Sequence, residues 1–123
     1  MSDGQSGTRP KVIYKICPAA LWREAEAAGV FHGSAVDRES GFIHFSTAAQ
    51  VAATAKRHFA RKAGLLLLGV AVSSLGNRLK WEPSRGGDLF PHLYGPLIAA
   101  DVLGVDPLPL GPDGLHRFPP LDD

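Results

Sequence analysis

The sequence predicts an α+β domain in which two helices pack on a split, mainly antiparallel β-sheet. The expected order is strand, helix, strand, helix and then mostly short strands, without the regular strand–helix alternation of a doubly wound parallel sheet. A chain of 123 residues is also the size of one domain, long enough to bury a core. The glycine patterns that hold phosphates in the common nucleotide-binding folds do not occur in it.

The first elements follow from side-chain type and from residues that stop helices. Residues 11–17 are rich in β-branched and aromatic side chains, which favours a strand. Residues 19–28 are rich in alanine and lie between a proline and a glycine, which favours a helix. Residues 30–41 are expected to form a loop because they combine Gly, Ser and Asp, and residues 42–45 a short strand.

The middle of the chain carries the second helix and a central strand. Thr47 and Gln50 resemble a capping box that opens a helix over about residues 48–62. Residues 65–72 are apolar on both faces, which is typical of a central strand.

Short strands complete the predicted domain. Residues 79–82 are expected to form one strand and residues 97–105 the last one. Residues 90–95 contain a proline and precede another, so only an edge strand or a bulged segment fits them.

We expect one globular domain, with a polar segment before it and a proline-rich segment after it. The domain is placed at residues 11–105. Residues 1–10 are polar and glycine-rich, without the apolar stretch of a signal peptide, and read as a disordered leader. Residues 106–123 are rich in proline and glycine and read as an extended or disordered C-terminal tail.

Composition favours a cytoplasmic monomer with no nucleic-acid or membrane partner. The net charge is +1, which provides no electrostatic reason for binding nucleic acid or a membrane surface. The single cysteine, Cys17, excludes an internal disulfide and a paired-cysteine metal site. No apolar run is long enough to span a bilayer. The sequence does not indicate a protein partner.

Two phrases of the sequence place a histidine in an apolar run. One reads GFIHFST and contains His44, and the other reads RGGDLFPHLYGP and contains His92. An unpaired imidazole in apolar surroundings is costly, so each histidine needs a polar partner or a wet cleft. Strand alternation puts Ser46 on the face of His44 and Tyr94 on the face of His92. We infer a shared groove for a small ligand, with two aromatic stacking surfaces: Phe42 and Phe90.

Three other interpretations remain open. Both histidines could be core residues bonded to backbone carbonyls. His44 and His92 could bind zinc together with Asp88 or Glu82, but the chain has no closely spaced histidine pair, so we expect no metal. Cys17 could be a nucleophile, but no motif of a catalytic cysteine surrounds it, and a small core residue is the simpler interpretation.

Three charged residues could serve such a groove, although each could equally be a solvated surface charge. Lys15 lies within the first strand, where its ammonium could hold a phosphate or a carboxylate. Glu82 could bond ribose hydroxyls or polarise a reacting group. Arg85 lies in a glycine-containing loop that could fold over a ligand and reach an anion.

The chain resembles a known family in four ordered phrases: IYKI, GFIHFSTAAQV, LKWE and GGDLFPHLYGPL. They resemble the mostly bacterial family called domain of unknown function 952, over about residues 11–105. The family's fold is similar to the ADP-ribosyltransferase fold, a split pair of small antiparallel sheets around a cleft for NAD. The resemblance therefore implies NAD as a possible cofactor.

The resemblance also assigns places to the candidate residues. It implies that Lys15 stands where a first-strand Arg or His holds NAD. It implies a second motif at His44 with its following Ser46 and Thr47. A third motif falls near a last set of residues: His92 and Tyr94, or Glu82.

We expect a groove for NAD, ADP-ribose or another phosphate-bearing ligand, in a domain that transfers ADP-ribosyl or phosphate groups. The catalytic candidates are Glu82, His44 and His92. The ligand-binding candidates are Lys15, His44, Ser46, Thr47, Arg85, His92 and Tyr94. The alternative is a binding or interaction module that kept the fold without the chemistry.

Overall fold

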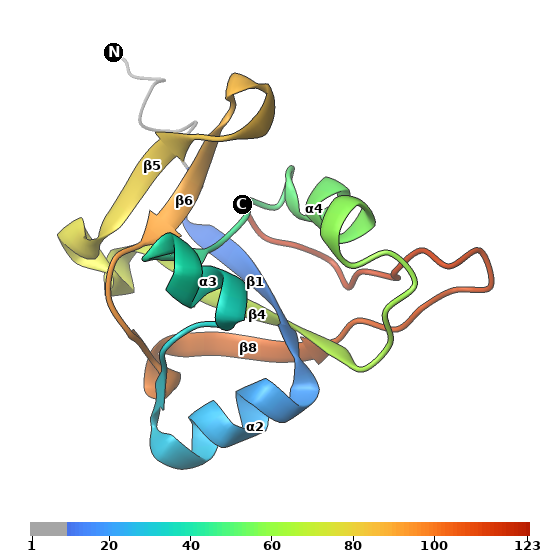
Figure 1. The fold of residues 1–123 in the computed structure, drawn as a ribbon, viewed down its shortest axis with the longest axis horizontal. Helices are drawn as coiled ribbons and strands as arrows, with labels where there is room; N and C mark the ends of the chain where they lie inside the picture. Colours follow the sequence, from blue (N-terminus) through green and yellow to red (C-terminus); the bar gives the residue numbers. More distant parts are fainter. Residues whose placement is uncertain (1–9) are drawn as a thin grey trace.

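Antiparallel strand pairs make up every sheet in residues 10–123, the part of the chain that the computed structural model describes (Figure 1). The first sheet has three strands in the order β1-β4-β8. They are β1 (Val12–Pro18), β4 (Leu65–Ala71) and β8 (Val102–Pro107). The predicted antiparallel arrangement is therefore confirmed.

The second sheet is also three-stranded, in the order β3-β6-β5. It contains β3 (Ile43–His44), β6 (Leu89–Leu93) and β5 (Leu79–Pro83). A small separate pair joins β2 (Val30–Phe31) to β7 (Leu97–Ile98).

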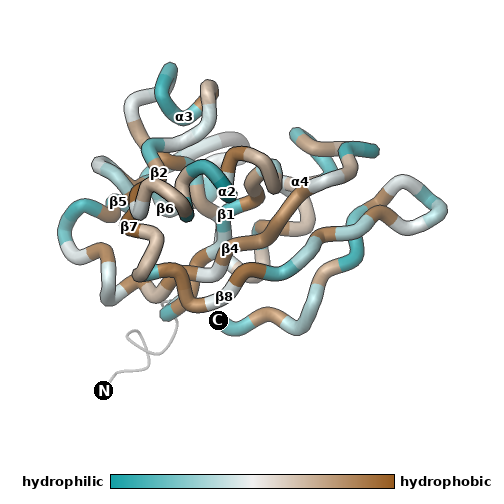
Figure 2. Tube along the Cα trace, turned by 90° about the horizontal axis from the view of Figure 1, so that it is seen from below, coloured by the Kyte–Doolittle hydropathy of each residue, from teal (hydrophilic) through white to brown (hydrophobic). Residues whose placement is uncertain are grey.

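Three α-helices accompany these strands in the described residues, one more than the two expected. They are α2 (Ala19–Ala28), α3 (Ala35–Ser40) and α4 (Val51–His58). Figure 1 shows α2 at one end of the molecule, where it contacts β1 and β2, and Figure 2 shows α3 at the outer edge. Four short 3-10 turns complete the chain: Val72–Ser74, Gly76–Arg78, Arg85–Gly87 and Ala99–Asp101.

Strand β1 buries side chains on both of its faces. Ile13 and Cys17 face a core that also contains Trp22 and Phe31, whereas Tyr14 and Ile16 face a second core beneath α4. Because both of their faces are buried, β1 and β4 have few polar residues. Figure 2 shows hydrophobic residues of β4 near the centre of the molecule. The Lys15 side chain lies on the same face of β1 as Ile13 and is therefore also buried inside the protein.

Strand β1 connects to the second sheet through its backbone. Tyr14 N–H donates to the Ser46 carbonyl and Ser46 N–H donates to the Tyr14 carbonyl, both at 2.8 Å. Because Ser46 lies two residues beyond β3, this bridge brings the middle of β1 beside the end of β3.

The segment after β8 is extended and packs on the second core. Leu108 is 1% exposed and its N–H donates to the Leu65 carbonyl at 3.1 Å. The backbone N–H of Asp122 donates to the Tyr14 hydroxyl at 2.7 Å. His116 is buried, with Nε2 2.7 Å from the Lys62 carbonyl. The proline-rich end of the chain thus covers one face of the first sheet.

Three element predictions are wrong. The loop predicted at residues 30–41 contains β2 and α3. The segment at residues 90–95 does not form an edge, because β6 lies between β3 and β5. Pro91 has no N–H to donate, but its carbonyl still accepts from Phe45 N–H at 3.0 Å. The last predicted strand divides into β7 and β8 because these pair with different sheets, which requires the turn at Ala99–Asp101.

The second helix is shorter than predicted. Helix α4 begins at Val51, after a turn in which Thr47 N–H donates to Gln50 Oε1 at 3.0 Å. This bond is half of the expected capping box. The helix ends at His58, before Arg61 adopts a left-handed backbone conformation with φ of 65°.

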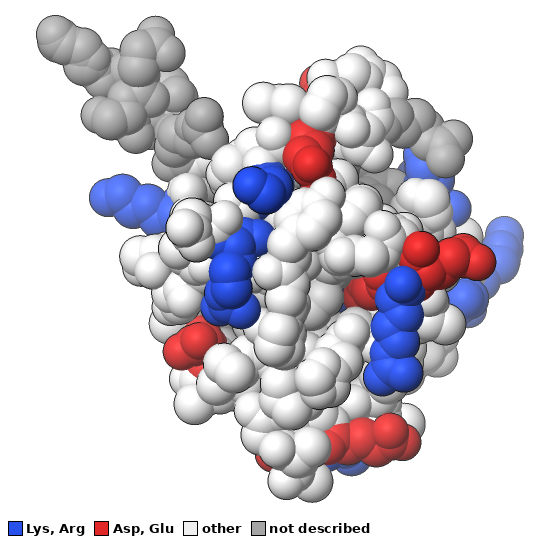
Figure 3. All heavy atoms as spheres, turned by 60° about the vertical axis from the view of Figure 1, so that its left-hand side comes forward, with Lys and Arg blue, Asp and Glu red and all other residues white. Residues whose placement is uncertain are grey.

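No helix within residues 10–123 is long and apolar enough to cross a membrane. On the face shown in Figure 3, basic and acidic side chains are interspersed among neutral ones. The leader predicted at residues 1–10 lies outside the described residues except for Pro10.

We expect the Leu108→Ala substitution to lower the free energy of unfolding by about 2–5 kcal/mol, because it leaves a cavity beneath the C-terminal segment. Urea denaturation measures the change. The matched control is Leu103→Ala in β8, where the side chain is 66% exposed and the expected change is within about 0.5 kcal/mol. Equal effects of the two substitutions would contradict the packing of the segment after β8.

Candidate functional site

Asp37 occupies the first turn of α3 and is 2% exposed. A capping box holds it there. Its side-chain Oδ2 accepts from Ser34 N–H at 2.9 Å, and its own N–H donates to Ser34 Oγ at 3.3 Å. The Ser-x-x-Asp pattern therefore starts α3 and also directs a carboxylate into the protein.

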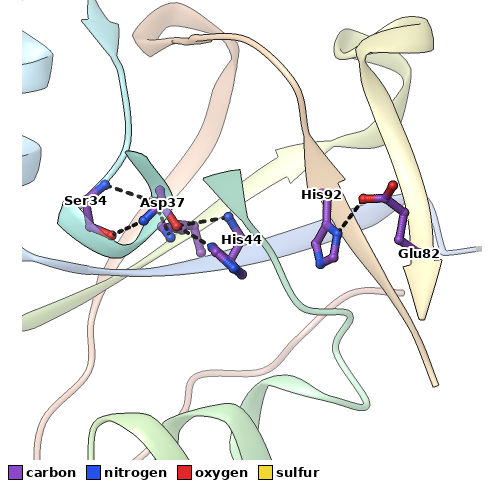
Figure 4. Close-up of polar contacts among 6 residues, drawn as sticks. Ser34, Asp37, His44, Glu82 and His92 are labelled. Atoms are coloured by element: carbon purple, nitrogen blue, oxygen red, sulfur yellow. Dashed lines mark hydrogen bonds and ion pairs between the residues drawn. The ribbon is translucent and has the colours of Figure 1, made fainter. Parts of the chain in front are cut away.

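The Asp37 carboxylate has two further partners from other elements (Figure 4). Lys15 Nζ of β1 lies 2.8 Å from Oδ2. His44 of β3 approaches Oδ1 twice, through Nδ1 at 2.7 Å and through its backbone N–H at 3.1 Å. Asp37, Lys15 and His44 thus form a network that ties α3, β1 and β3 together.

Burial and pairing act in opposite directions on the pKa of Asp37. Burial raises this pKa, but hydrogen bonds from His44 and the adjacent charge of Lys15 outweigh burial and hold it well below the ordinary value of 3.8. The carboxylate is therefore charged at neutral pH, and the Lys15 ammonium compensates that charge inside the protein.

A second network lies on β5, β6 and the residue after β6. Glu82 Oε1 accepts from His92 Nδ1 and from the Tyr94 hydroxyl, each at 2.7 Å. These two hydrogen bonds lower the pKa of Glu82, and the bond to Glu82 raises the pKa of Tyr94. His92 is 6% exposed, whereas the Glu82 side chain is 35% exposed and Tyr94 37%.

Strand register brings the two networks together. His44 of β3 pairs directly with His92 of β6, and their ring centroids lie 5.6 Å apart. The Phe42 ring stacks on His92, with centroids 4.0 Å apart and planes at 22°. It also lies 4.6 Å from His44 and 5.3 Å from Tyr94. We call Phe42, His44, His92 and Tyr94 the aromatic cluster.

The two imidazoles share one bonding pattern. Nδ1 of each donates to a carboxylate, which leaves Nε2 as the second ring nitrogen. Within residues 10–123 no hydrogen bond to either Nε2 is found. An imidazole held in this way takes a proton at Nε2 when neutral and gives one there when protonated. The arrangement can therefore transfer protons to and from a bound ligand.

The structure brings together five of the predicted site residues: Lys15, His44, Glu82, His92 and Tyr94. It places Lys15 as the partner of Asp37, with a side chain that is 7% exposed. Ser46 and Thr47 lie elsewhere: Ser46 Oγ pairs with Thr54 Oγ1 of α4 at 2.9 Å, and Thr47 belongs to the turn before that helix. The side chain of Arg85 lies outside the described residues.

Asp37 is the site residue that the sequence interpretation missed. A signal was present, because Ser34 and Asp37 have the spacing of a capping box and Gly41 stands where a short helix would end. Identifying that helix would have located the carboxylate. Its partner Lys15 could then have been sought on the inner face of β1.

The structure also bears on the three other interpretations of the sequence. Nδ1 of each histidine bonds a carboxylate, where the core interpretation expects a backbone carbonyl. Among the described residues, no three His, Cys, Asp or Glu side chains are placed to hold a metal ion. Cys17 is fully buried, and burial raises the pKa of its thiol to about 11, so the thiol is protonated at neutral pH.

We expect Lys15→Met to lower the free energy of unfolding by about 3–5 kcal/mol, because it leaves the buried Asp37 carboxylate without its cation. Adding Asp37→Asn should restore part of this loss by removing the unpaired charge. Urea denaturation of both variants measures the effects. Lys11→Met, at an exposed position just before β1, is the control, with a change within about 0.5 kcal/mol. A similarly small loss in Lys15→Met would contradict the pairing.

The low pKa of Asp37 predicts acid-sensitive stability. The folded pKa lies below the ordinary value of 3.8, so the stabilisation is present above about pH 4 and is lost as the pH falls toward the folded pKa. Stability of Asp37→Asn should therefore fall less steeply below pH 4 than that of the wild type. Denaturation at a series of pH values measures this, with Glu39→Gln on the exposed side of α3 as the control. Parallel curves for wild type and Asp37→Asn would contradict the assignment.

Comparison with known proteins identifies relatives of this chain. None of the curated proteins matches it. The crystal structure of protein CC0527 from Caulobacter crescentus is 48% identical, with a TM-score of 0.83, and the match covers 86% of this chain and 93% of that one. The solution NMR structure of CC0527 is also 48% identical, with a TM-score of 0.79, covering 86% and 91%. The model of the family "Protein of unknown function (DUF952)" matches residues 16–105. The chain therefore belongs to the DUF952 family.

Proposed function

We propose that the domain binds a phosphate-bearing ligand of the nucleotide type at the aromatic cluster and transfers an ADP-ribosyl or phosphate group. The observation that carries this proposal is the pair His44 and His92, whose rings lie 5.6 Å apart while a carboxylate holds Nδ1 of each. Two imidazoles at this separation can act on one reacting centre. One removes a proton from the attacking hydroxyl or water, and in phosphate transfer the other protonates the leaving oxygen. In ADP-ribosyl transfer from NAD the leaving group is neutral nicotinamide, which takes no proton, so only the first role is used.

The carboxylates support this role by fixing the rings. A carboxylate that accepts from Nδ1–H selects the tautomer with its lone pair on Nε2. Asp37 does so from a buried position and Glu82 from a half-exposed one. The rings are therefore oriented before a ligand arrives, which lowers the cost of reaching the reactive geometry.

The aromatic cluster also supports a ligand with a planar ring. Phe42 is half-buried and Tyr94 is 37% exposed, so both present ring surface at the edge of the site. Nucleobases and nicotinamide stack on such surfaces. We further propose that the two three-stranded antiparallel sheets correspond to the split sheets of the ADP-ribosyltransferase fold. The ligand would then be NAD or ADP-ribose. The active unit would be a single copy of the chain.

A second candidate function is a binding module without catalysis. The observation in its favour is that the charges beside the imidazoles are already paired. The Lys15 ammonium bonds Asp37, and Glu82 Oε1 accepts two hydrogen bonds. A transferase needs charged or polar groups that stabilise the charge developing in the transition state. Because the charged groups here are already paired with one another, the site could bind a ligand without catalysing a reaction.

A ligand titration tests the binding at the aromatic cluster that both candidate functions require. We expect millimolar ADP-ribose to shift the amide and imidazole resonances of His44 and His92 in isotope-labelled protein. His44→Asn and His92→Asn should weaken this binding about tenfold or more. Asparagine retains a donor near the Nδ1 position and lacks Nε2. The matched control, His58→Asn on α4, should bind as the wild type does. Absence of shifts at the aromatic cluster would exclude this ligand class.

Turnover of NAD distinguishes the two candidates. A transferase should release nicotinamide from NAD, and His44→Asn should lower that rate by about 100-fold or more. A binding module should show the ligand shifts without nicotinamide release. Release that is equal in wild type and His44→Asn would exclude the proposed role of this imidazole.

A further inference from the structure

A depression of about 310 Å³ lies beside the aromatic cluster. It shares Phe42 and Asp37 with the candidate site, so its wall begins one ring away from His44 and His92. Phe42 therefore borders both the aromatic cluster and the depression. The proposed function leaves the depression unused.

Two side chains at the depression can bind an anion. Arg38 of α3 and His32, just after β2, both line it and are both exposed. Within residues 10–123, no hydrogen bond or ion pair is found for the Arg38 guanidinium or the His32 ring. A guanidinium presents paired N–H groups that match the oxygens of a phosphate, and the imidazole adds another donor.

The remaining walls do not oppose an anion. Asp37 is the carboxylate that lines the depression, and its charge is compensated by the Lys15 ammonium. Ile43 and Leu93 also line the depression and carry no charge.

Gly41 and Gly95 line the depression and have φ of 90° and 132°, values that side-chain-bearing residues rarely adopt. Both positions therefore favour glycine.

We propose that Arg38 and His32 form a second anion subsite, so that the ligand of this domain carries two linked phosphates rather than one. The ligand would be a nucleoside diphosphate or its ester, with one phosphate at the imidazoles and the other at Arg38. This inference rests on the proposed function and deepens it, because it selects ADP-ribose-type ligands over nucleoside monophosphates.

The test compares ADP-ribose with AMP, which has the same nucleoside and a single phosphate. Affinities are measured by NMR titration of wild type, Arg38→Gln and His32→Gln. Arg38→Gln should weaken ADP-ribose about tenfold or more and leave AMP almost unchanged, because one charge-assisted contact is lost. His32→Gln should have a smaller effect in the same direction, and Arg38→Lys should restore part of the affinity.

Arg23→Gln is the matched control, since it removes the same charge from an exposed position on α2 and should preserve both affinities. The amide spectrum of each variant without ligand verifies that it is folded. If Arg38→Gln weakens both ligands equally, or neither, the second subsite is wrong while the proposed function stands. If neither ligand shifts the wild-type resonances of His44 and His92, the proposed function fails and the subsite fails with it.

Discussion

The buried contact between Asp37 and Lys15 is the interaction on which the rest of the site depends. Their charged atoms lie 2.8 Å apart, and both side chains are almost fully buried. Removing two charges from water is costly, and their mutual attraction offsets that cost only when further hydrogen bonds support the pair. Here Ser34 and His44 provide them. The same atoms join α3 to β1 and β3, so the ion pair stabilises the fold and positions one imidazole at once.

The second imidazole depends on strand pairing rather than on charge. His92 stands opposite His44 because β3 and β6 pair in that register. A slip by one residue would turn one of the two rings to the other face of the sheet. Phe42 then fills the space beside both rings, and Glu82 reaches His92 from the neighbouring strand β5. Two independent carboxylates thus orient two adjacent histidines, an arrangement suited to proton transfer. The proposed binding of a nucleotide-type ligand rests on the two Nε2 atoms, which have no hydrogen bond within the described residues, and on the depression next to Phe42.

Several features of the site could be predicted from local sequence. Alternation along β1 correctly places Lys15 with Ile13 and Cys17, and alternation along β6 places His92 with Tyr94. The partner of Lys15 could not be predicted in this way, because Asp37 is 22 residues distant and its short helix was interpreted as a loop. For Ser46, local alternation is misleading. It places Ser46 on the same strand face as His44, but β3 ends at His44 and the chain turns toward α4, where Ser46 contacts Thr54.

The sequence by itself determined the α+β class, the two longer helices and the strands β1, β4 and β5, because these depend on side-chain periodicity and on residues that favour turns. The tertiary structure decided which polar groups meet. It made β6 a central strand despite Pro91, and it packed the C-terminal segment on the core through Leu108. It also turned Lys15 toward a carboxylate rather than toward solvent. These outcomes depend on pairing between distant segments, and local patterns do not encode which distant partner a buried charge will find.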